Sequence, residues 1–127
     1  MASFTVGGNS FPLAQEAPTG PKNFHAYWDS PPAALKPRRV DAAWLAEARR
    51  VEVDAGDAAD WPAGWATQSL EQAALAYEGL AFSPREGRQW SVHLPSGYDA
   101  KADAIKRQQL TRAGARLAWV LKAVFAD

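Results

Sequence analysis

The chain contains no cysteine, which excludes disulfides, thiol nucleophiles, redox-active dithiols and thiolate zinc sites. It has no excess charge of either sign, because 14 basic residues balance 14 acidic ones. A protein without net charge has no overall attraction to nucleic acid or to an anionic membrane, so any such partner must be bound locally. No apolar run approaches the roughly 18 residues of a transmembrane helix, so we predict no membrane span.

The first six residues show no targeting signal. They carry neither a basic segment nor an apolar core, so no signal peptide is visible at this end of the chain. The compartment is therefore unknown from the residues alone.

The length of 127 residues predicts one small domain over residues 1–127. Six of the nine prolines fall within residues 1–37, so we expect this region to be rich in loops. One short helix fits between the prolines, over residues 24–30, with Asn23 as its N-cap. From Val40 onward the composition turns to Ala, Leu, Glu and Arg, which predicts a helical core and an all-α fold.

We predict three helices in this core, over residues 41–50, 61–79 and 99–125, and a brief strand over 90–94. Gly79 is expected to end the second helix, and Asp99 to cap the third. Gly114 lies within the third helix, so we expect another backbone or a large side chain to pack against it. The apolar residues that recur at helical spacing along the third helix are Ile105, Ala113, Leu117, Leu121, Val124 and Phe125.

His25 and Asp29 are the first candidates for chemistry. At positions i and i+4 of a helix they share one face, so both could bind one metal ion or each other. Zinc accepts both imidazole nitrogen and carboxylate oxygen. Spacing alone does not decide between a pair of metal ligands and a hydrogen-bonded surface pair.

Gly7, Gly8 and Asn9 are the second candidates. Two glycines permit positive φ and close backbone approach, and the Asn side chain offers a donor and an acceptor. An ordinary turn explains the tripeptide as well, and no Lys-Ser/Thr pair follows it as in a phosphate-binding loop. His93, the other imidazole, is expected to be solvated or bonded locally.

Taken together, four segments resemble the zinc-dependent S1/P1 nuclease family. Residues 7–9 read Gly-Gly-Asn, and residues 23–29 read Asn-Phe-His-Ala-Tyr-Trp-Asp, similar to the family's Asn-Leu-His-x-x-Trp-Asp. Residues 65–77 are similar to its Trp-Ala-x-acid-small helix with a later Tyr, and residues 113–118 to its Ala-Gly-x-Arg-Leu-Ala helix. The order and approximate spacing agree over residues 6–125.

The resemblance implies a largely helical fold shared by zinc nucleases and zinc phospholipase C, with a cluster of three zinc ions. It also implies a secreted or periplasmic enzyme that hydrolyses phosphodiester bonds in single-stranded DNA or RNA. By this resemblance His25 and Asp29 are ligands of one zinc ion, and Gly7, Gly8 and Asn9 form a loop beside the cluster. Clustered zinc ions would activate a water and neutralise charge on the phosphoryl oxygens, so no protein nucleophile is needed.

The resemblance covers the C-terminal half of the family's domain. The other His and Asp ligands, including a His-x-x-x-Asp-x-x-x-x-x-His block before Gly-Gly-Asn, have no counterpart, and Gln68 stands where the family has an acidic residue. We therefore expect a fragment with an incomplete metal site and little or no nuclease activity of its own. Two alternatives stay open. One is a non-catalytic helical remnant or interaction module that self-associates through the surface of the missing half; the other, less favoured, is a zinc phospholipase C-like enzyme.

Overall fold

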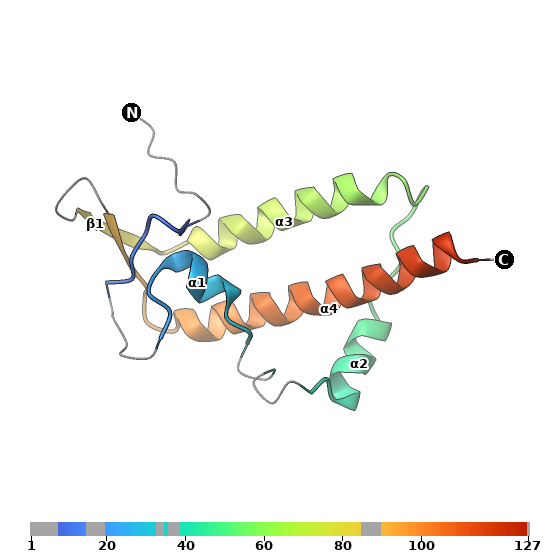
Figure 1. The fold of residues 1–127 in the computed structure, drawn as a ribbon, viewed down its shortest axis with the longest axis horizontal. Helices are drawn as coiled ribbons and strands as arrows, with labels where there is room; N and C mark the ends of the chain where they lie inside the picture. Colours follow the sequence, from blue (N-terminus) through green and yellow to red (C-terminus); the bar gives the residue numbers. More distant parts are fainter. Residues whose placement is uncertain (1–7, 15–19, 33–34, 36–38, 85–89, 127) are drawn as a thin grey trace. The chain divides into compact units, whose positions relative to one another are not determined.

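The computed structural model describes residues 8–14, 20–32, 35, 39–84 and 90–126. These residues are mostly helical, which confirms the coarse prediction, and they add a small two-stranded sheet that an all-α fold lacks. The elements, in chain order, are α1 (Phe24–Asp29), α2 (Ala42–Arg49), α3 (Trp61–Tyr77), β1 (Ala81–Pro84), β2 (Trp90–His93) and α4 (Tyr98–Val124) (Figure 1). None of the helices in this described part is long and apolar enough to cross a bilayer.

The described residues fall into two compact units. Unit 1 lies within residues 1–31 and 77–102, and unit 2 within residues 32–76 and 103–127. The single domain expected over residues 1–127 stays a prediction.

Unit 1 is organised around β2. Strands β1 and β2 pair antiparallel, with Phe82 opposite Val92. On the other edge of β2, the Val92 N–H donates to the Pro12 carbonyl at 2.9 Å, and the Ala14 N–H donates to the Val92 carbonyl at 2.9 Å. Val92 is therefore enclosed from both sides, and the core that surrounds it consists of Phe11, Leu13, Phe24, Val92, Tyr98 and Ala102.

Helix α1 forms as the sequence predicts, one residue shorter than expected. The Asn23 side chain accepts a hydrogen bond from the Ala26 N–H at 2.8 Å, which satisfies one of the free amides at the helix start. Two prolines follow Ser30, and the residue before a proline is driven out of the helical region, so the helix ends there. A six-residue helix has little stability of its own, so its position depends on what it packs against.

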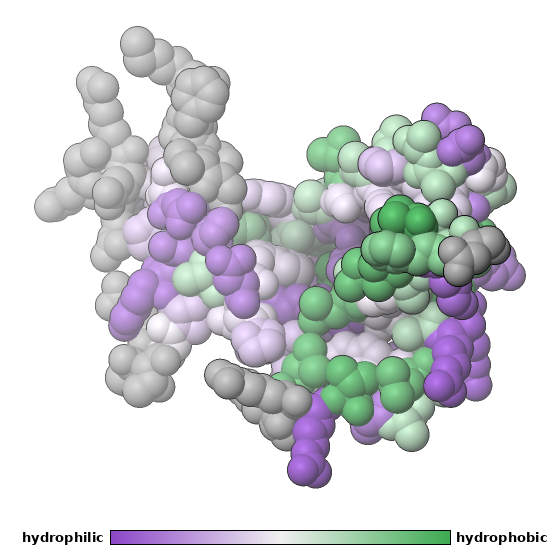
Figure 2. Space-filling view, turned by 45° about the vertical axis from the view of Figure 1, so that its right-hand side comes forward, coloured by the Kyte–Doolittle hydropathy of each residue, from purple (hydrophilic) through white to green (hydrophobic). Residues whose placement is uncertain are grey.

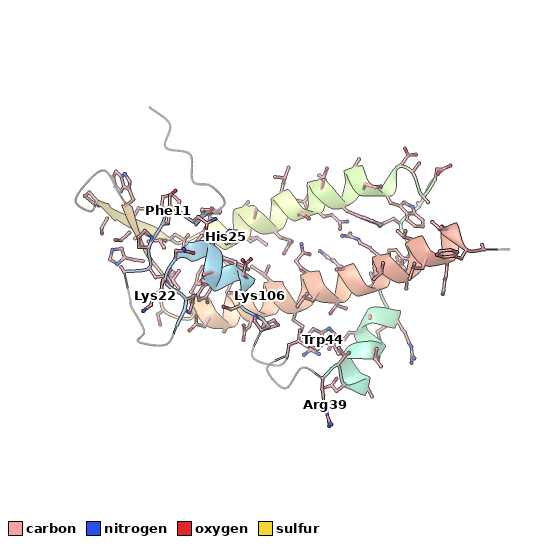
Figure 3. The ribbon with its side chains drawn as sticks, in the orientation of Figure 1. Phe11, Lys22, His25, Arg39, Trp44 and Lys106 are labelled. Atoms are coloured by element: carbon pink, nitrogen blue, oxygen red, sulfur yellow. The ribbon has the colours of Figure 1, made fainter. Side chains whose placement is uncertain are left out.

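Unit 2 buries Trp44 against polar partners and packs Trp61 against the rings of Trp65 and Trp119. The Asp41 side chain caps α2 by accepting from the Trp44 N–H at 2.8 Å, and the buried Trp44 indole donates to Thr111 Oγ1 on α4 at 2.7 Å (Figure 3). The Arg107 guanidinium lies 4.6 Å from the centre of the Trp44 ring. The α4 side chain of Arg116 lies in the same way over Trp65 of α3, at 5.1 Å.

Several sequence predictions about α4 are wrong. The helix begins at Tyr98, so Asp99 lies in its first turn and is not its cap. Apart from the adjoining backbone of α4 itself, no atom of the described residues lies within 4 Å of the position that a Cβ at Gly114 would take, so the expected close contact is absent among them. Strand β1 was not expected at all, because four residues of the pattern Ala-Phe-Ser-Pro show no alternation long enough to identify a strand.

The apolar face expected along α4 is largely exposed. Phe125 has 75% of its surface accessible, and Leu70 of α3 has 72%. Figure 2, which brings the C-terminal part of α4 forward, shows green apolar side chains open to solvent. Helical periodicity identifies which residues share a face, but it does not tell whether anything covers that face. The large exposed residues of α3 and α4 within unit 2 are Leu70, Leu75, Leu110, Leu117, Leu121 and Val124.

Candidate metal centre

Helix α1 brings His25 and Asp29 together. The distance from His25 Nε2 to Asp29 Oδ2 is 3.1 Å, as the i, i+4 spacing predicts. Both side chains reach solvent, with 42% of the His25 side chain and 70% of the Asp29 side chain exposed. Both donor groups are therefore accessible from solvent.

The separation of the two donor atoms suits one zinc ion. Zinc bonds imidazole nitrogen and carboxylate oxygen at about 2.0–2.2 Å, and tetrahedral angles then place two ligand atoms about 3.3 Å apart. The observed 3.1 Å is close to that separation, so little movement would be needed to hold a metal ion. The same geometry is that of a hydrogen-bonded pair, so the two readings from the sequence both remain compatible with it.

The pair offers two donor groups, about half of the number that zinc requires. Structural and catalytic zinc sites use about four ligands, of which at least three come from protein. Within the ranges that the structure describes, no group of three or more His, Asp or Glu side chains is arranged to hold a metal ion. His25 and Asp29 fit the metal in type and separation, and further donors would have to join them.

Gly8 lies directly against the start of α1. Its φ is +89°, a conformation that favours glycine, and its carbonyl accepts from the Phe11 N–H at 3.1 Å to close the turn. A Cβ at this position would lie 3.0 Å from Phe24 Cδ1 and 3.1 Å from the His25 backbone nitrogen. The turn therefore needs glycine for two reasons, and it places Gly8 next to His25. Asn9 is exposed, and Gly7 lies outside the described residues.

Helix α1 packs against aromatic side chains. Phe24, with 2% of its surface exposed, meets Tyr77 edge to face at a ring separation of 5.2 Å. The ring of Tyr98 contacts three residues of α1, namely Phe24, Tyr27 and Trp28, at 5.7–6.5 Å. Burial raises the pKa of Tyr98 to about 12, so it stays neutral over the whole physiological range.

Sequence reasoning missed one contact of α1. The Tyr27 hydroxyl donates to Asp99 Oδ1 at 2.5 Å, across 72 positions of the chain. Tyr27 occupies a variable position of the motif that carries His25 and Asp29, and Asp99 was interpreted only as a helix cap. No local pattern links residues so far apart, so spacing could not have revealed the contact.

The remaining candidates, His93 and Gln68, have hydrogen-bond partners of their own. His93 Nε2 is 2.7 Å from Ser83 Oγ across the β1–β2 hairpin, which confirms that it is bonded locally. Gln68, which stands where the family has an acidic residue, accepts from Arg116 Nη2, and Asp54 Oδ2 lies 3.8 Å from Arg116 Nε.

Comparison with known proteins identifies the family. No curated protein and no solved structure matches the chain. A family model described as S1/P1 Nuclease matches residues 2–126, nearly the whole chain, which confirms the resemblance seen in the sequence. The chain belongs to the S1/P1 nuclease family.

Proposed function

We propose that this chain takes part in zinc-dependent hydrolysis of phosphodiester bonds in single-stranded DNA or RNA. Its family supports a nuclease role and favours it over zinc phospholipase C chemistry. The observation that carries the proposal is the 3.1 Å separation of His25 Nε2 and Asp29 Oδ2, beside the turn at Gly8.

Each residue of the site has a defined task in this proposal. His25 and Asp29 would hold one zinc ion through Nε2 and Oδ2, with the imidazole neutral and the carboxylate ionised. A zinc ion so held supplies Lewis acidity and lowers the pKa of a bound water. Gly8 keeps the neighbouring turn free of a side chain, and Phe24 fixes the helix to the core of unit 1.

We propose further that the chain holds only part of the family's site. Two donors leave about two coordination positions of a zinc ion for other ligands. A segment that carries the family's His-x-x-x-Asp-x-x-x-x-x-His pattern, in the same polypeptide or in another, would provide them. Residues 1–127 alone should then bind zinc weakly and cleave little nucleic acid.

The test measures cleavage of a single-stranded oligonucleotide with added zinc. Residues 1–127 are assayed alone and after a segment with the His-x-x-x-Asp-x-x-x-x-x-His pattern is supplied. We expect activity only in the second case, abolished by His25→Ala. His93→Ala is the matched control, because His93 is bonded within the hairpin and should leave activity unchanged. Full activity of residues 1–127 alone would contradict the partial site.

The second candidate function is an interaction module without catalysis, which self-associates through its apolar surface. It is favoured by the exposure of large apolar side chains on α3 and α4 (Figure 2), among them Leu70, Leu117 and Phe125. Soluble monomers rarely expose extended apolar patches. Sedimentation velocity of residues 1–127 tests it: a species larger than the monomer that dissociates in the double variant Leu117→Gln, Phe125→Gln supports it, and a monomer at all concentrations contradicts it.

A further inference from the structure

We propose that Tyr27 and Asp99 are positioning residues of the metal-binding helix. Their hydrogen bond fixes the rotation of α1, so that His25 and Asp29 present their donor atoms together. The inference rests on the proposed function, because it concerns the same pair of ligands.

The anchors and the ligands of α1 lie on different faces of the helix. Successive residues of an α-helix are separated by about 100° around its axis. Phe24, Tyr27 and Trp28 therefore fall within one sector, and their rings all contact Tyr98. His25 and Asp29 share another sector, centred roughly 130° away from that of the aromatic residues. A rotation of α1 about its own axis, against the ring of Tyr98, would move both ligands relative to the turn at Gly8.

Ring packing alone leaves such a rotation weakly opposed. Burial of apolar surface is non-directional, whereas a hydrogen bond requires a defined distance and angle. The bond from the Tyr27 hydroxyl to Asp99 Oδ1, at 2.5 Å, joins the middle of α1 to the first turn of α4. It therefore supplies the directional restraint that the rings lack.

Asp99 is well placed to act as a fixed acceptor. A carboxylate in the first turn of a helix is stabilised by the unpaired amides of that turn. Its neighbour Tyr98 is buried in the core of unit 1, which limits movement of the backbone at this position. Six residues of helix cannot hold their own orientation, so the restraint has to come from outside α1.

The test uses residues 1–127 and zinc alone, with no nucleic acid. Zinc affinity is measured by competition with a fluorescent zinc indicator, and the His25 ring nitrogens are followed by NMR with and without zinc. Tyr27→Phe removes the hydroxyl and keeps the ring. Asp99→Ala removes the acceptor, whereas Asp99→Asn removes the charge and keeps an acceptor oxygen. Tyr77→Phe is the matched control for loss of a tyrosine hydroxyl in unit 1.

We expect Tyr27→Phe and Asp99→Ala to weaken zinc binding by roughly 3- to 10-fold, the worth of one hydrogen bond. Asp99→Asn should restore affinity to within about twofold, and Tyr77→Phe should leave it unchanged, on the same basis. The His25 nitrogen shifts of the metal-free protein should change in Tyr27→Phe and stay as in the wild type in Asp99→Asn. If Asp99→Ala does not fold, the contrast between Tyr27→Phe and Asp99→Asn carries the test, since both keep the aromatic packing.

Two outcomes separate failure of the inference from failure of the proposed function. If the wild type binds zinc no better than His25→Ala, the proposed metal site itself is wrong. If the wild type binds zinc better than His25→Ala but Tyr27→Phe binds it equally well, the positioning role is wrong. Equal losses in Asp99→Asn and Asp99→Ala would also overturn it, because charge rather than a directed hydrogen bond would then be responsible.

Discussion

The two compact units bury their aromatic residues in contrasting ways. In unit 1, Phe24 and Tyr98 lie in one closed apolar core with Val92 at its centre. In unit 2, the buried Trp44 bonds to the Thr111 hydroxyl and lies under the Arg107 guanidinium. Unit 1 thus buries the aromatic face of a short helix in one core, whereas unit 2 leaves leucines of α3 and α4, such as Leu70 and Leu117, exposed.

This contrast explains where the candidate site lies. Helix α1 carries His25 and Asp29 and belongs to the unit with the closed core. Full burial of a phenylalanine stabilises a protein by about 1.5–3 kcal/mol relative to exposure. Phe24 is buried and contributes such stabilisation, whereas Phe125 of unit 2 is mostly exposed and contributes little of it. The candidate ligands His25 and Asp29 therefore lie on the unit with the closed core, and the large exposed apolar side chains of α3 and α4 lie on unit 2.

The strongest test of this contrast compares the same substitution in the two units. Phe24→Ala should lower the free energy of unfolding by about 3–5 kcal/mol, because it removes a ring from a closed core. Phe125→Ala should change it by less than about 0.5 kcal/mol, because the ring is 75% exposed. Urea unfolding followed by far-UV circular dichroism measures both.

The comparison fails if the two variants lose similar stability. A large loss in Phe125→Ala would mean that the apolar face of α4 is covered in solution, by a second copy of the chain for example. Repeating the measurement at a tenfold lower protein concentration separates these cases, since stabilisation by association depends on concentration.

Much of the local structure could be predicted from the sequence. The short helix after Asn23, the helices that begin near Asp41 and Trp61 and the strand near Trp90 all form where the residue pattern places them. Asn23 and Asp41 act as N-caps because a side-chain oxygen can reach an amide of the first turn, a property of the residue type alone. The pairing of His25 with Asp29 is also predictable, because residues four positions apart lie on the same face of a helix.

Contacts between distant segments could not be predicted. The bond between Tyr27 and Asp99, and that between Trp44 and Thr111, join residues 72 and 67 positions apart, and neither leaves a periodic pattern. The exposure of Leu117 and Phe125 could not be predicted either. Periodicity shows which residues share a helix face, but it does not show whether another segment covers that face.

Within unit 2, the Trp44–Thr111 bond should be the most sensitive single polar contact. Thr111→Val keeps the shape but leaves the buried indole N–H without its acceptor, which should cost about 1–3 kcal/mol of unfolding free energy. Thr111→Ser keeps the hydroxyl and serves as the control. In a Trp44→Phe background, Thr111→Val should be nearly neutral, since no donor is left unsatisfied. Equal losses in both backgrounds would show that another contact of the hydroxyl, such as its bond to the Arg107 carbonyl, and not the indole hydrogen bond is responsible.

In unit 1, Tyr98 should make stability depend on alkaline pH. Burial raises the pKa of its hydroxyl from 10.0 to about 12, so the folded state keeps a proton that the unfolded state has lost. The stabilisation is complete below pH 10 and is lost as the pH rises from 10 toward about 12. Urea midpoints measured across this range should fall, and Tyr98→Phe should flatten the dependence. A variant whose slope matches the wild type would assign the effect to other groups.

The smallest effect is expected for the ion pair between Glu47 and Arg107 in unit 2. Arg107 Nη2 donates to Glu47 Oε1 at 2.7 Å, and this hydrogen bond lowers the pKa of the Glu47 carboxyl below its ordinary value of 4.5. A lowered pKa gives stability above pH 4.5 that is lost as the pH falls through the folded-state value. Both side chains are partly exposed, and solvent screening weakens such pairs.

Glu47→Gln should therefore lower the urea midpoint slightly at pH 7 and not at all at pH 3. The control is Glu71→Gln on the exposed surface of α3, which should have no effect at either pH. A loss that persists at pH 3 would show that Glu47 stabilises α2 by packing and not by its charge.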